Sequence, residues 1–150
     1  MNIAIRSAGG IALQFPLYDG IMGILIGTGL AKVIAGWFVA ISTPETFYMF
    51  QFWGAGVVNL FVPSGGGQWA VQGPITIEAA KMMNIDAVKS AMMVAWGDQW
   101  TNMIQPFWAL PLLGLAGLSA KDIMGYTTMT LLWAGLVLSG FALLIGFGVM

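Results

Sequence analysis

The composition of this 150-residue chain excludes several classes of protein at once. Hydrophobic residues make up 59% of the chain and charged residues only 7%, whereas a soluble domain carries about 25% charged residues. So few charges cannot cover a water-facing surface, and the composition therefore predicts an integral membrane protein. The net charge of −1 argues against a nucleic-acid partner. Because His and Cys are absent, zinc sites, thiol catalysis and a Ser-His-Asp triad are excluded.

The first third of the chain, over residues 10–41, predicts a transmembrane helix followed by an interfacial helix. Residues 10–28 are long enough to span, although Pro16 and Asp19 interrupt them. Residues 30–41 contain a lysine and a tryptophan, which is typical of a helix at the membrane interface or of the end of a tilted span. Asp19 is either a buried functional carboxylate or a group near a helix end or a water-filled cleft.

Two helix starts are marked by capping residues. Asp86 is positioned as the N-cap of a helix that follows it. Ser119 and Asp122 have the spacing of an N-cap and its N3 acceptor. No charge follows Asp122, and about 20 apolar residues span the hydrocarbon core of a bilayer. We therefore predict an ordinary transmembrane helix over residues 122–148, with a scaffold role.

The uncharged run of residues 46–77 predicts a hairpin. Thr43-Pro44-Glu45 reads as an N-cap, a proline at the first helical position and an acid in the first turn. One helix over this run would reach about 48 Å, and Pro63 and three glycines break it halfway. Each resulting arm is about 24 Å long, which is short for a core of about 30 Å. We favour a re-entrant hairpin over residues 46–83; two tilted complete spans are the alternative.

The tip of this hairpin has the character of a ligand site. Irregular backbone at membrane depth is tolerated only inside protein or against a water-filled cavity. A second arm that begins at about Gln68 would point free N–H groups at an anion such as a carboxylate. Carbonyls at the end of the first arm suit a cation, and a plain tight turn is the alternative. The candidate residues are Asn59, Ser64, Gly65, Gly66, Gly67, Gln68 and Trp69.

A second break follows in the segment of residues 87–118, for which we predict a broken transmembrane helix. A carboxylate at membrane depth, here Asp98, is costly and normally faces a partner or an aqueous path. Pro106 lacks an N–H and clashes with the carbonyl of Asn102. Carbonyls freed near Thr101 and Asn102 can then bind a cation, as in the discontinuous helices of secondary transporters. An ordinary proline-kinked helix is the alternative.

Three segments resemble hallmark sequences of the short-chain fatty acid transporter family. They are residues 57–74 (VVNLFVPSGGGQWAVQGP), residues 96–108 (WGDQWTNMIQPFW) and residues 13–18 (LQFPLY). More distantly, a glycine tip with tryptophan, followed by Gly-Asp and Thr-Asn, is similar to aminobenzoyl-glutamate transporters and to other elevator-type ion-coupled carriers. The resemblance implies ion-coupled uptake of short carboxylates such as butyrate or acetoacetate. It also implies a multi-pass protein of the bacterial inner (plasma) membrane and no enzymatic activity.

In the wider fold implied by the resemblance, two inverted repeats each supply one hairpin and one broken helix. The hairpin tip and the helix break together form the substrate and cation site. Carried over residue by residue, this site consists of Asn59, Ser64, Gly65, Gly66, Gly67, Gln68, Trp69, Asp98, Thr101, Asn102 and Pro106. A sodium ion would lie near Ser64, Gly66, Thr101 and Asn102. The alternative coupling ion is a proton carried by Asp98, and no other cofactor is expected.

The resemblance covers only the C-terminal third of the longer family members. We therefore expect residues 1–150 to form a single membrane domain that is the C-terminal part of a larger two-repeat transporter. The expected partners are a small carboxylate, membrane lipid, and an N-terminal half or further copies of the chain. The alternative is a non-transporting membrane subunit or a remnant with a structural role. An intramembrane enzyme is not supported, because Ser64 and Asp98 have no basic partner in the sequence.

Overall fold

The computed structural model describes residues 16–17, 19–24 and 26–149, and every regular element in them is a helix. The prediction of an all-helical chain is confirmed for these residues. After helical residues between 16 and 27, the elements are α2 (Leu30–Ala40), α3 (Phe47–Asn59), α4 (Gly65–Met82), α5 (Ala87–Thr101), the short 3-10 helices η1 (Asn102–Ile104) and η2 (Pro106–Ala109), α6 (Leu110–Ala116) and α7 (Ala120–Gly146). The start of the first predicted span and most of segment 13–18 lie outside the described residues.

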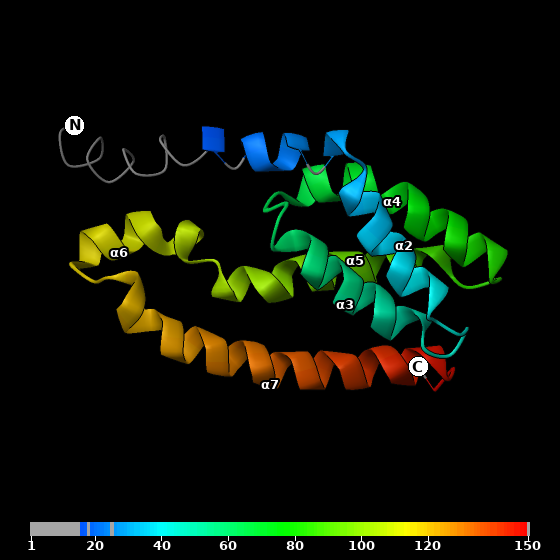
Figure 1. The fold of residues 1–150 in the computed structure, drawn as a ribbon. Coiled ribbons are helices and arrows are strands. Elements are labelled where there is room, and N and C mark those ends of the chain that lie inside the picture. The colour runs from blue at the N-terminus through cyan, green and yellow to red at the C-terminus, as the bar shows by residue number, and fades with distance from the viewer. Residues whose placement is uncertain (1–15, 18, 25, 150) are drawn as a thin grey trace.

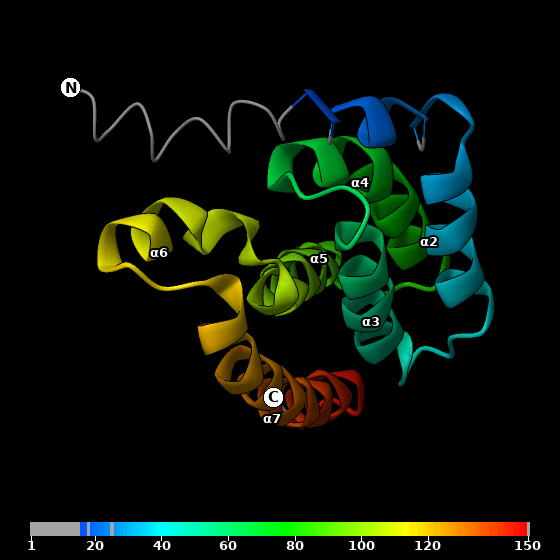
Figure 2. The same cartoon turned by 60° about the vertical axis from the view of Figure 1, so that its left-hand side comes forward.

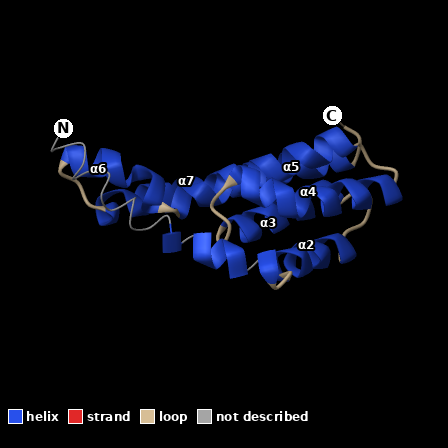
Figure 3. Ribbon diagram, turned by 90° about the horizontal axis from the view of Figure 1, so that it is seen from above, coloured by secondary structure: helices blue, strands red, loops and turns tan. Residues whose placement is uncertain are grey.

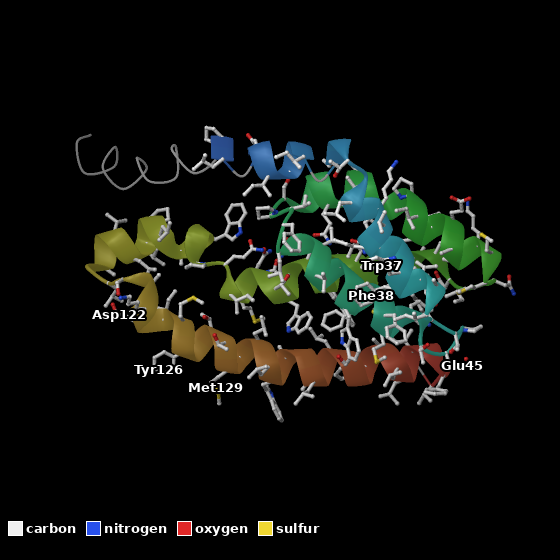
Figure 4. The ribbon with its side chains drawn as sticks, viewed as in Figure 1. Trp37, Phe38, Glu45, Asp122, Tyr126 and Met129 are labelled. Atoms are coloured by element: carbon white, nitrogen blue, oxygen red, sulfur yellow. The ribbon has the colours of Figure 1, made fainter. Side chains whose placement is uncertain are left out.

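Helix α7 runs along the whole length of the molecule (Figure 1). Among the described helices it alone is long and apolar enough to cross a membrane. At its start, the backbone N–H and the hydroxyl of Ser119 donate to the Asp122 carboxylate at 2.7 and 2.8 Å, as the predicted cap requires. Tyr126 and Met129 point away from the other helices (Figure 4). Most of its surface is therefore open to the surroundings of the molecule.

Helix α3 lies beside only the C-terminal half of α7. Before α3 begins, the carbonyl of Glu45 lies against Gly146, at the end of α7. Further along, the indole N–H of Trp53 donates to the Ser139 hydroxyl at 2.8 Å. Helix α3 then ends at Asn59. The remaining helices gather at the same end, with α6 at the opposite end (Figure 3).

Helix α5 lies between α3, α4 and α7 (Figure 2). Glycines allow this close packing: the ring of Trp100 occupies the space that a side chain would need at Gly56 and Gly135. The Trp100 indole N–H donates to the Leu131 carbonyl at 2.8 Å. The buried core draws on α3, α4, α5 and α7; its residues are Phe47, Tyr48, Phe52, Ala79, Ala80, Met93 and Ala142.

Uncharged polar side chains join α3 and α4. The Thr76 hydroxyl donates to Gln51 Oε1 at 2.8 Å. Nearer the tip, Gln68 Nε2 donates to the Ala55 carbonyl at 2.8 Å and to Gln72 Oε1 at 3.0 Å. All four of these side chains are buried, so their hydrogen bonds offset the cost of removing polar groups from water. We call these residues the polar seam of the hairpin.

Two predicted helix starts differ from the structure. Helix α3 begins at Phe47, not after Thr43. The Thr46 hydroxyl accepts the backbone N–H of Thr43 at 2.9 Å, and this bond closes residues 43–46 into a turn. Helix α4 begins at Gly65, not at about Gln68. Glycine is unfavourable in helix interiors. Here the Ser64 side chain caps the first turn, and this stabilises a helix that starts with the three glycines.

Replacing Asp86 with alanine should weaken the start of α5. One carboxylate oxygen of Asp86 accepts the backbone N–H groups of Val88 at 2.7 Å and Lys89 at 3.2 Å. Loss of such an N-cap costs about 1 kcal/mol, so we expect a lower melting temperature for Asp86→Ala in detergent. Asp86→Asn keeps the cap and should melt like the parent. Equal losses in both variants would show that the negative charge, and not the cap, stabilises α5.

Candidate functional site

The hairpin tip contains a tight turn followed by a capped helix start. The Val62 N–H donates to the Val58 carbonyl at 3.0 Å and closes the end of α3. The Ser64 hydroxyl then accepts the N–H of Gly67 at 3.3 Å as the N-cap of α4. The N–H groups of Gly65 and Gly66 have no acceptor within their own helix. The start of α4 therefore presents backbone donors and the positive end of a helix dipole.

The second break lies between α5 and α6. Helix α5 passes into η1 after Thr101, and Gln105 adopts an extended conformation with φ −98° and ψ 93°. Pro106 then begins η2. The Asn102 carbonyl, predicted to be free for a cation, accepts the Gln105 N–H at 3.1 Å. The local turn therefore uses one of the two lone pairs of that carbonyl, and cation binding there stays a prediction.

Asn59 joins the tip to the break. Its side-chain Nδ2 lies 2.7 Å from the Asp98 carbonyl, 2.9 Å from Thr101 Oγ1 and 3.0 Å from Asn102 Oδ1, and donates to them. In return, Gln105 Nε2 donates to the Asn59 carbonyl at 2.9 Å. Asn59 is fully buried. The two irregular segments, about 40 residues apart in sequence, are therefore held together by the amide side chains of Asn59 and Gln105.

A cavity of about 450 Å³ opens between the start of α4 and one face of α5. Its lining residues are Gly65, Gln68, Trp69, Ala91, Val94, Ala95, Asp98 and Gln99. The Asp98 carboxylate faces the first turn of α4, because a Cβ built on Gly65 would lie 3.6 Å from Asp98 Oδ2. Backbone donors, a carboxylate and apolar side chains thus border the same cavity.

Four buried oxygen atoms around the tip and the break have no hydrogen-bond donor among the described residues. They are Asn59 Oδ1, Gln68 Oε1, Asp98 Oδ1 and Gln105 Oε1. The amide orientations are fixed by contacts: Gln68 Nε2 and Gln105 Nε2 each donate to a backbone carbonyl, which can only accept. Buried polar atoms normally have a hydrogen-bond partner, so these four acceptors are suited to bind a cation or a hydrogen-bond donor.

The described residues contain no group of three or more Asp or Glu side chains that could hold a metal ion. Any cation here would therefore depend on amide and carbonyl oxygens together with Asp98. The predicted sodium ligands fall into two groups in the structure. Ser64 and Gly66 belong to the start of α4, whereas Thr101 and Asn102 contact Asn59.

The structure brings most of the predicted site residues together. Gly65, Gln68 and Trp69 share the cavity with Asp98. Pro106 begins η2 and does not line this cavity. Two features of the site were not predicted from the sequence: Gln105, which donates to the tip, and the small residues of α5 that line the cavity. The latter carry one signal, since Ala91, Val94 and Ala95 precede Asp98 by seven, four and three residues and share its helix face.

Comparison with known proteins identifies the family. The family model described as short chain fatty acid transporter matches residues 1–145. The chain belongs to the short-chain fatty acid transporter family. This confirms the resemblance carried by segments 57–74 and 96–108, which are the two segments that meet at Asn59. As a member of this transporter family, the chain is a membrane protein.

Two curated relatives, both provisionally named short-chain fatty acid transporters, match most of the chain. It is 44% identical over 137 residues to a protein of Escherichia coli (strain K12), a match that covers 91% of this chain and 31% of that protein. It is also 44% identical over 130 residues to a Haemophilus influenzae protein, covering 87% of this chain and 29% of the relative. The chain thus spans less than a third of the length of these transporters. No solved structure matches it.

Proposed function

We propose that this chain forms one half of the substrate site of a secondary carrier, which takes up a short-chain carboxylate such as butyrate or acetoacetate together with a cation. The observation that carries the proposal is the cavity where the start of α4 faces Asp98. A carboxylate fits the free N–H groups at that helix start. The names of the two relatives, which refer to short-chain fatty acids, support this class of substrate.

The depth of the cavity supports a re-entrant hairpin over residues 46–83. Trp100 bonds to Leu131 and packs on Gly135, which lie close to the middle of α7 (Ala120–Gly146). If α7 spans the bilayer, this level is its midplane, and Asn59 lies at the same level through its bonds to the end of α5. The hairpin would then stop halfway across, as expected for a transporter site built from discontinuous helices.

The positions of two carboxylates are consistent with this placement of the hairpin in the bilayer. Glu45 and Asp122 lie at opposite ends of the molecule (Figure 4). Hydrogen bonds from its own backbone N–H and from the Thr43 hydroxyl hold the pKa of Glu45 below its usual range, so this residue stays ionised at neutral pH. We propose a multi-pass arrangement in a bacterial inner membrane, with both of these carboxylates at the water interface.

The charge balance of the cavity favours ion coupling. A substrate carboxylate at the start of α4 would lie near the carboxylate of Asp98, and two like charges at one site oppose each other. A sodium ion or a proton bound at the same time removes this repulsion. The free oxygens of Asn59, Gln68, Asp98 and Gln105 are suitable sodium ligands, as unwound backbone and amide oxygens are in other transporters. Substrate and cation would therefore bind together.

A partner would complete the site. Trp69 and Ala95 line the cavity but are exposed, so one side of the site is open. The greater length of the relatives supports an N-terminal half as the segment that covers it; further copies of the chain are the alternative. If the chain instead has only a structural role in the membrane, the cavity should bind no carboxylate.

Uptake of radiolabelled butyrate into proteoliposomes, with and without a sodium gradient, tests the proposal. The chain is reconstituted alone and together with the N-terminal part of the Escherichia coli relative. We expect gradient-driven uptake that falls at least tenfold in Asp98→Asn, because the amide keeps the shape but lacks the charge that holds the cation. The matched control is Asp122→Asn at the start of α7, which should transport normally.

Two results would contradict the proposal. Absence of uptake in both reconstitutions would favour the structural role. Undiminished, sodium-dependent uptake by Asp98→Asn would show that the cation binds elsewhere. Uptake that responds to a pH gradient and not to sodium would support the proposed carrier function and identify the proton as the coupling ion.

A further inference from the structure

We infer that Ala91 and Ala95 set the length of the acyl chain that the cavity accepts, an inference that rests on the proposed carboxylate site. The cavity has a polar end and an apolar wall. Gly65 and Asp98 form the polar end, and Ala91, Val94 and Ala95 form the wall. When a carboxylate is held at the polar end, its hydrocarbon chain would extend along this wall.

The direction of the wall follows from the helix. Ala91, Val94, Ala95 and Asp98 lie on one face of α5 because residues three, four and seven apart share a face. At 1.5 Å per residue, Ala95 lies about 5 Å and Ala91 about 10 Å from Asp98 along the axis. The far end of a butyrate chain would therefore contact Ala95, whereas acetate would fall short of it, and only a longer chain would reach Ala91.

Trp69, across the cavity, does not occupy this space. Its ring lies over Gly73 of its own helix, where a Cβ would be only 2.8 Å from Trp69 Cδ2. The indole thus lies against its own helix α4 and forms a second wall of the cavity, opposite α5. Because the α5 side contributes a methyl group at each of the two alanine positions, the room between the walls depends directly on the size of those side chains.

Leucine at either alanine position should restrict the cavity without disturbing the core. Ala95 is exposed and Ala91 is half-buried, and neither belongs to the buried core. One methylene more or less in an apolar pocket changes recognition on the order of tenfold. Acetate has only a methyl group beyond its carboxylate and stays at the polar end. Butyrate extends along the wall and should be affected selectively.

The test measures the dissociation constants of radiolabelled acetate and butyrate by equilibrium dialysis with sodium present, using the full chain in detergent, alone and together with the N-terminal part of the Escherichia coli relative. We expect Ala95→Leu to weaken butyrate on the order of tenfold and to leave acetate unchanged. Ala91→Leu should affect butyrate less and longer acids more. The matched control is Ala116→Leu, an exposed alanine on α6 that does not line the cavity. Melting temperatures check that each variant is folded.

The outcomes separate this inference from the proposed function. If the parent chain binds both acids but the ratio of the butyrate to the acetate dissociation constant in both leucine variants equals that of the parent, the inference is wrong and the carboxylate site stands. Equal weakening of both acids in Ala95→Leu and Ala91→Leu would likewise overturn it. If neither acid binds to the parent chain, alone or with the N-terminal part of the relative, the proposed site and the inference both fail.

Discussion

Gly97→Ala is expected to separate α5 from α3 and to cause a large loss of stability for the addition of a single methyl group. A Cβ at Gly97 would collide with the Phe52 carbonyl and lie 2.6 Å from Ala55 Cβ and 2.9 Å from the Gly56 nitrogen. Two of these three atoms belong to the backbone of α3 and cannot rotate away. Overpacking of this kind costs about 1–3 kcal/mol, and more where the backbone must move.

The measurement is the melting temperature of the purified chain in detergent, compared with that of Gly114→Ala. A Cβ at Gly114, on α6, meets nothing within 4 Å, and alanine favours a helix over glycine by about 1 kcal/mol. The control should therefore melt at the same temperature as the parent or higher. If Gly97→Ala had the same melting temperature as the control, the inferred close packing of α5 on α3 would be contradicted.

Asn59→Ala is expected to abolish substrate binding as well as to destabilise the chain. The substitution leaves Asn102 Oδ1 without its Asn59 donor. Thr101 Oγ1 and the Asp98 carbonyl each lose one hydrogen bond but keep another, to the Gly56 carbonyl and from the Asn102 N–H respectively. Each buried polar group left without a partner costs about 1–3 kcal/mol. The hairpin tip would then be held to the break only by the bonds from Gln105 to the backbone carbonyl at position 59 and from Thr101 to the Gly56 carbonyl, which we expect to be too few to keep the geometry that the cavity requires.

The readouts are the melting temperature and butyrate binding. The control Trp53→Phe removes a single hydrogen bond, to Ser139 on α7, in a partly exposed position. It should lower the melting temperature slightly and keep butyrate binding. An Asn59→Ala variant that bound butyrate like the parent would show that the tip and the break are positioned independently of this side chain.

The sequence was informative where a feature depends on local backbone chemistry. Asp86 and Ser119 were found as helix starts because an N-cap bonds within its own first turn. The tip and the break were found because glycine and proline act on their own backbone. The start of α4 was placed too late because three glycines suggest a loop, whereas the Ser64 cap begins the helix at the first of them.

Long-range features of the site could not be predicted. Gln105 bonds to the Asn59 carbonyl, and nothing in its sequence neighbourhood indicates which carbonyl it reaches. The face of α5 that borders the cavity is fixed by the contact of Gly97 with α3. Glycine at this position carries no periodic signal, and alanine at 91 and 95 fits a lipid-facing, buried or cavity-lining face equally well.

The polar seam has a consequence for the synthesis of the protein. Gln68, Gln72 and Thr76 give α4 a buried polar face, and of the described helices only α7 is long and apolar enough to cross a bilayer. In hydrocarbon, each unpaired amide costs several kcal/mol. We therefore expect α4 to pair with Gln51 and the Ala55 carbonyl of α3 at the translocon. The two arms of the hairpin would then insert into the lipid together.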